Sequence, residues 1–95
     1  MRKNDYTEAE NVFEALGFAP VEAANLTARA ELMVKAAEII KTQGLTQAQA
    51  AKMCGVSQPR ISDLMNFRGD RFSVDTLMEI VALLGGKVEI HVKAA

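Results

Sequence analysis

The chain has 95 residues, of which 49% are hydrophobic, 5% aromatic and 24% charged, and its formal net charge is -1. This length suits one small domain, and the hydrophobic fraction excludes a chain that is disordered by composition. One Cys and one His exclude an intrachain disulfide and a Cys-based zinc site, so a cytoplasmic location is expected and no metal or other cofactor. No apolar run reaches the ~18 residues of a membrane span, and no secretory signal opens the chain.

The charges are distributed unevenly along the chain. Residues 1–40 hold four basic and seven acidic residues, residues 41–71 hold five basic and two acidic, and residues 72–95 hold two basic and three acidic. The middle block is therefore basic although the whole chain is slightly acidic. A local basic excess matters for nucleic-acid binding only where it coincides with a binding motif.

Turn residues divide the chain into three parts. Residues 1–19 form a weakly patterned N-terminal segment, with a short helix expected to end near Gly17 and to dock on the core. Residues 20–86 form the main helical domain. Residues 87–95 form a C-terminal strand and tail.

A long helix is expected to begin between Pro20 and Asn25 and to end near Gln43, because Pro suits a first turn and Gly44 suits a left-handed helix end. Apolar residues recur along it at helical spacing. They are Leu26, Ala30, Met33, Val34, Ala37 and Ile40.

Two short helices are expected next. Thr46 and Gln49 form a capping box that predicts a helix over residues 47–54. Gly55 ends it, and a second helix follows over residues 57–66. This is the arrangement of a DNA-binding helix-turn-helix, in which a tight glycine turn presents the second helix to a groove.

A fourth helix and a strand complete the pattern. Ser73 can cap a helix with an apolar stripe formed by Val74, Leu77, Met78, Val81 and Leu84. Residues 87–93 alternate polar and apolar side chains, which is typical of one half-buried strand. The predicted fold is therefore mostly α, a bundle of four to five helices with one C-terminal β-strand.

Within the helix-turn-helix, three small or apolar residues are expected to hold the helices together. Ala50 lies where the two helices cross, and Val56 and Ile61 fill the space beneath the turn. Cys54 is expected to be a small buried hydrophobe.

The segments Leu45–Ala51 and Gly55–Ser62 resemble the phage-repressor-like, or XRE, helix-turn-helix family, whose fold is the lambda-repressor-like bundle. More narrowly, residues 11–92 resemble the branch of HigA-type antitoxins. That resemblance implies a sequence-specific regulator that represses its own operon and neutralises a RelE/HigB-type toxin. Phe67 departs from the pattern, since relatives often carry a basic or small residue there.

The candidate DNA-binding residues are Thr46, Gln47, Ser57, Gln58, Pro59, Arg60, Ser62, Asp63, Asn66, Arg68 and Arg71. Gln58 is expected to read adenine, because its amide matches the N6 and N7 edge. Arg60 can reach guanine or a phosphate while it pairs with Asp63 at i,i+3. Asp63 either accepts from cytosine N4 or repels phosphate.

The other candidates have simpler expected roles. Pro59 either touches a thymine methyl group or only stiffens the turn. Thr46 and Gln47 open a helix whose N-terminus favours phosphate. Ser57 is expected to cap its helix. The residues that flank the groove as phosphate ligands are Ser62, Asn66, Arg68 and Arg71, whereas Lys41 and Lys52 are expected to be solvated.

A self-complementary dimer is predicted from the single strand. Val88, Ile90 and Val92 would lie over the core while the strand backbone pairs with the same strand of a second copy. Two recognition helices one DNA turn apart would then read an inverted repeat in double-stranded DNA. The alternative is a strand that folds back on its own chain.

The chain offers no Gly-rich phosphate loop, nucleophile elbow or metal-ligand pair, so an enzyme is not expected. Three functions remain: an antitoxin that binds toxin and operator, a stand-alone XRE repressor, and an interaction module that has lost DNA binding. In the antitoxin hypothesis, the toxin would bind to apolar residues that lie among acidic ones, namely Val12, Phe13, Leu16 and Phe18. These acidic residues are Asp5, Glu8, Glu10, Glu14, Glu22, Glu31 and Glu38.

Overall fold

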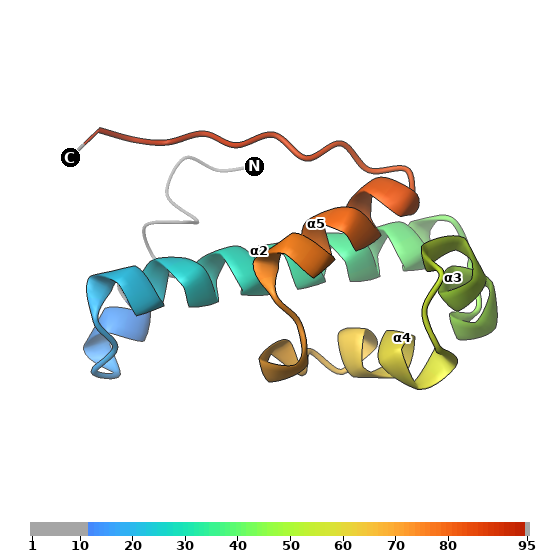
Figure 1. The fold of residues 1–95 in the computed structure, drawn as a ribbon, viewed down its shortest axis with the longest axis horizontal. Helices are drawn as coiled ribbons and strands as arrows, with labels where there is room; N and C mark the ends of the chain where they lie inside the picture. Colours follow the sequence, from blue (N-terminus) through green and yellow to red (C-terminus); the bar gives the residue numbers. More distant parts are fainter. Residues whose placement is uncertain (1–11, 95) are drawn as a thin grey trace.

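The computed structural model describes residues 12–94, and the acidic positions Asp5, Glu8 and Glu10 lie outside them. One long helix crosses the molecule and the shorter helices pack around it (Figure 1). The elements are α2 (Pro20–Thr42), α3 (Gln47–Cys54), α4 (Gln58–Met65), the 3-10 helix η1 (Gly69–Arg71) and α5 (Val74–Leu83). Residues 12–15 are also helical. No helix of the described part is long and apolar enough to cross a membrane.

The helix starts follow from side-chain capping. Thr46 and Gln49 form the predicted capping box, with both reciprocal hydrogen bonds present. Ser57 and Ser73 each accept a hydrogen bond from the backbone N–H three residues later. Each cap satisfies a backbone donor that the helix itself leaves unpaired, which fixes where α3, α4 and α5 begin.

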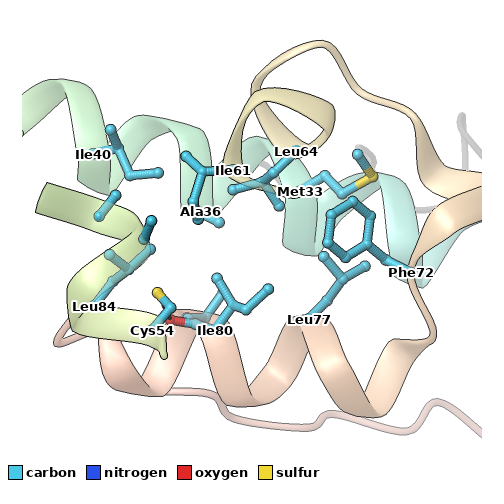
Figure 2. Close-up of a cluster of buried hydrophobic side chains, with 13 residues drawn as sticks. Met33, Ala36, Ile40, Cys54, Ile61, Leu64, Phe72, Leu77, Ile80 and Leu84 are labelled. Carbon is cyan, nitrogen blue, oxygen red and sulfur yellow. Dashed lines mark hydrogen bonds between the residues drawn. The ribbon is translucent and has the colours of Figure 1, made fainter. Parts of the chain in front are cut away.

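The core lies between α2 and the other helices, where the side chains in Figure 2 meet. It is formed by Met33, Ala36, Ile40, Ala50, Ala51, Cys54, Ile61, Leu64, Phe72, Leu77, Ile80, Val81 and Leu84. Cys54 is a buried free thiol, as predicted, and burial raises its pKa.

The predicted stripe of α2 is only partly right. Ala30 and Val34 are exposed, whereas Ala36 and Ala23 are buried. The reason is that α2 packs against α5 on one side and against α4 and η1 on another, so its buried surface is not one stripe. On α5, Ile80 was likewise missed by the single stripe and is buried.

The predicted C-terminal strand is not present: the described residues contain no strand, and residues 87–94 run back past α5 as an extended segment (Figure 1). Val88 packs against the core, but Ile90 and Val92 are 72% and 90% exposed, so the expectation that all three cover the core is wrong. A strand requires a hydrogen-bonded partner, and no other described segment of the same chain pairs with this one.

The N-terminal segment meets α2 through one aromatic residue. Phe13 is half-buried and stacks edge-on against Phe18, with ring centroids 6.1 Å apart. It lines a groove of about 470 Å³, together with residues of α2 and the segment 67–70. Val12, Leu16 and Phe18 are exposed, so docking of this segment involves mainly Phe13.

Candidate nucleic-acid interface

The two short helices form a helix-turn-helix. α3 ends at Gly55, whose φ of 66° is left-handed, and the N–H of Val56 donates to the carbonyl of Ala51. α4 begins directly after Ser57. Ala50 and Ile61 are completely buried where predicted, and Val56 packs against the core at the turn. The turn therefore has a fixed geometry, and α4 is held with one face outward.

The exposed N-terminal turn of α4 carries Ser57, Gln58 and Pro59. Ser57 is occupied in capping, because its hydroxyl accepts from the N–H of Arg60 at 3.3 Å. The side chain of Gln58 makes no hydrogen bond with another described residue, and its amide is available to an outside partner. A recognition helix presents its first residues to base edges in this way.

Thr46 and Gln47 lie at the start of α3. The Thr46 hydroxyl accepts from Gln49 N at 3.1 Å, and Gln49 Oε1 accepts from Thr46 N at 2.9 Å. The other backbone N–H groups in the first turn of α3 take no part in these two bonds and have no acceptor within the helix. A phosphate at this end would complete their hydrogen bonding.

Arg60 does not have its predicted partner. Its Nη1 donates to the carbonyl of Arg71 at 2.9 Å, and its guanidinium carbon lies 4.5 Å from the centre of the Phe72 ring. The expected Arg60–Asp63 pair is therefore absent. The cause is the return of the chain through η1, which places an aromatic face and a carbonyl beside Arg60.

Asp63 pairs instead with two other arginines. Its Oδ1 lies 3.8 Å from Arg68 Nε, and its Oδ2 lies 3.7 Å from Arg71 Nη1. Both arginines are exposed, so three candidate residues form one cluster beside the outward face of α4.

Ser62 and Asn66 also interact with each other. Asn66 Nδ2 donates to the Ser62 carbonyl at 2.9 Å and approaches the Ser62 hydroxyl at 3.4 Å. These bonds close the last turn of α4. The two side chains are thus partly committed to the helix end, and the Ser62 hydroxyl keeps donor capacity.

Two supporting residues were not identified from the sequence. Phe72 is buried and forms the surface on which Arg60 lies. Arg29 of α2 donates from Nη1 to the carbonyl of Gly69 at 3.0 Å, which ties η1 to the long helix. Arg29 lies between Leu26 and Met33 on the apolar face of α2. A charged residue on an apolar face was the feature of the sequence that could have indicated its contact with another segment.

Comparisons with known proteins agree with this geometry. A family described as "Helix-turn-helix domain" matches residues 12–93. A solved structure described as an XRE family transcriptional regulator is 31% identical, with a TM-score of 0.72 over 78% of this chain and 83% of that chain. The chain belongs to the XRE helix-turn-helix family of transcriptional regulators. A comparison with curated proteins found no match.

Proposed function

We propose that this XRE protein is a non-enzymatic, cytoplasmic repressor that binds an inverted repeat in double-stranded DNA as a homodimer. The observation that carries the proposal is the exposed first turn of α4, where Gln58 has no partner among the described residues while Arg68 and Arg71 flank the same helix. An exposed amide can both donate to and accept from a base edge, and an exposed guanidinium group can donate to phosphate oxygens.

Gln58 is the proposed base-reading residue. Replacing Gln58 with Ala should cost ~1–3 kcal/mol at one operator position and relax the base preference there. The measurement is binding to every single-base variant of a duplex that the wild-type protein selects from a random library. Asn25→Ala, an exposed amide on α2, is the control and should leave the preferences unchanged. Equal weakening on all sequences would contradict base reading by Gln58.

Arg68 and Arg71 are the proposed phosphate ligands. Arg68→Ala or Arg71→Ala should weaken binding to all sequences and reduce the slope of log K against log salt by about one per lost contact. Lys52→Ala removes an exposed charge from α3 and should change the slope less. A slope that is unchanged in both arginine variants would place the phosphates elsewhere.

The homodimer would form through residues 87–93. The exposed side chains of Ile90 and Val92 and the extended backbone support pairing with the same segment of a second copy, which would supply the missing strand partner. Sedimentation of a chain that ends after Gly86 tests this. A truncated chain that is still dimeric would mean that the tail is not the main interface.

The finer proposal is that of a HigA-like antitoxin with a RelE/HigB-type toxin partner. Exposed Val12, Leu16 and Phe18 beside acidic Glu14 and Glu22 support it, since apolar anchors among acidic residues suit a basic partner. Leu16→Lys should then weaken toxin neutralisation at least tenfold and leave operator binding unchanged. Leu83→Lys on α5 is the control, because Leu83 is also an exposed Leu.

The alternative is a stand-alone XRE repressor. The half-burial of Phe13 in the groove against α2 favours it, because the N-terminal segment then serves its own fold. An adjacent reading frame that encodes a small basic toxin would separate the two. Full neutralisation by the Leu16→Lys variant would also argue for the alternative or for another toxin surface.

A further inference from the structure

The carboxylate of Asp63 lies between two of the proposed phosphate ligands. Asp63 is in the second turn of α4, its side chain is 24% exposed, and the guanidinium groups of Arg68 and Arg71 lie within 4 Å of its two oxygens. Both arginines come from beyond the helix. An acidic residue beside a phosphate-binding surface opposes binding by direct repulsion, so its position calls for a role that acts through the arginines.

The backbone after α4 brings Arg68 back over Asp63. Phe67 is left-handed with φ of 56°, and this turn allows Arg68 N to donate to the Asp63 carbonyl at 3.0 Å. Arg68 is thus linked to Asp63 through both backbone and side chain. The recorded contact between these side chains is 3.8 Å from Arg68 Nε to Asp63 Oδ1, and a guanidinium group has five N–H donors, so Arg68 keeps donors for another ligand.

A second attachment holds Arg71. Its carbonyl accepts from Arg60 Nη1, and the Arg60 guanidinium lies over the buried Phe72 ring. Arg60 is therefore occupied in joining α4 to η1. The side chain of Arg71 leaves this fixed backbone toward Asp63, which sets the direction of its guanidinium.

Stability does not account for the two ion pairs. Both arginine side chains are more than half exposed, and exposed pairs contribute little to the free energy of unfolding. Guanidinium groups that are held in one orientation lose less conformational entropy when they bind DNA. They also fit one placement of the phosphates better than others. A fixed pair of arginines favours the register in which α4 also meets its bases.

We propose that Asp63 is a positioning residue that determines specificity by holding Arg68 and Arg71 as an oriented pair, rather than by contacting DNA itself. This rests on the proposed DNA-binding function. Removal of the carboxylate charge frees both arginines to contact phosphates in any register. Binding to the operator then weakens while binding to random DNA is retained or strengthened.

The test is Asp63→Asn, measured on the wild-type-selected operator duplex and on a random duplex of equal length. We expect the ratio of the affinity for the operator to the affinity for random DNA to fall about tenfold, with an unchanged melting temperature. Asp70→Asn is the matched control, because it removes the same charge from η1, where the structure records no ion pair of Asp70 with another described residue. It should change the ratio less than twofold.

A double-mutant cycle shows whether Asp63 acts through the arginines. In an Arg68→Ala/Arg71→Ala background, Asp63→Asn should no longer change the ratio. NMR of the arginine Nε–Hε groups adds a structural measurement, in which the Arg68 signal should shift in Asp63→Asn and not in Asp70→Asn.

Three results would overturn the proposal. The first is a ratio within twofold of wild type in Asp63→Asn. The second is a loss confined to one base pair, which would mean direct base reading by Asp63. The third is a full effect of Asp63→Asn in the background without the two arginines. A wild-type protein that selects no sequence from the library would instead contradict DNA binding itself, and this proposal with it.

Discussion

The chain leaves α3 and α4 through the same backbone pattern, with a different residue at the left-handed position. After α3, Gly55 has φ of 66°, and after α4, Phe67 has φ of 56°. In both turns the next N–H donates five residues back, from Val56 to Ala51 and from Arg68 to Asp63. Glycine adopts this conformation without steric cost, whereas a bulky residue is strained by about 1–2 kcal/mol.

The two turns lead to different places in the molecule: the first leads into the core and the second leads to the surface. Gly55 leads into Val56, which packs on the core and sets the angle of the two helices. Phe67 leads into Arg68, which is exposed beside Asp63. Phe67 itself is 55% exposed and lines the groove below α2. Strain of this kind is kept where surrounding structure holds it, often at a functional site.

The largest effect is expected at the residue that supports the second turn. Phe72→Ala should destabilise the fold by ~3–5 kcal/mol, because it opens a cavity in the core and removes the ring beneath Arg60. Phe72→Leu keeps most of the volume and should cost less than about 1.5 kcal/mol. The free energy of unfolding in urea measures both. A cost below 1 kcal/mol for the alanine variant would show that the ring does not support the turn.

The next effect concerns the first turn. Ala50→Leu should destabilise by ~1–3 kcal/mol through overpacking, since Ala50 is completely buried between the helices of the core. Lys52→Leu on the exposed side of α3 is the control with the same new side chain. An unchanged denaturation midpoint for Ala50→Leu would argue against close packing there.

The sequence predicted what local chemistry determines. The capping box at Thr46, the serine caps and the glycine turn between α3 and α4 follow from interactions within a few residues, and each was found where expected. Long-range partners were not predictable in the same way. Arg60 was assigned to Asp63 because the two are three residues apart, but the chain's return through η1 gave Arg60 the Phe72 ring and the Arg71 carbonyl.

The C-terminal segment illustrates the other limit of sequence patterns. Alternation over residues 87–93 gives the faces that a strand would have, but a pattern cannot supply the second strand. In the single chain only Val88 finds a packing surface, and the following apolar residues are exposed. An alternating sequence is therefore compatible with an extended tail as well as with a strand, and a strand forms only where a second segment pairs with the tail.

A smaller effect is expected from replacing the glycine of the first turn. Gly55→Ala should destabilise by about 1 kcal/mol, because the new Cβ meets no atom within 4 Å and the cost is conformational alone. Gly69→Ala, at a position without a left-handed φ and with 3.5 Å to the Met33 sulfur, is the comparison. If Gly55→Ala were neutral, left-handed strain would be too small to distinguish the two turns.

An effect of similar size tests the strain at Phe67 directly. Asn tolerates the left-handed region better than Ala, while both substitutions remove the same aromatic contacts with the groove. Phe67→Asn should therefore be more stable than Phe67→Ala, by about 1 kcal/mol. The difference in urea midpoint between the two variants measures this. At exposed Lys52 in α3 the Ala variant should instead be more stable than the Asn variant, because Ala suits a helix better than Asn. Equal stability of the two Phe67 variants would mean that the turn after α4 relaxes out of its left-handed conformation, and Arg68 would then lose its backbone link to Asp63.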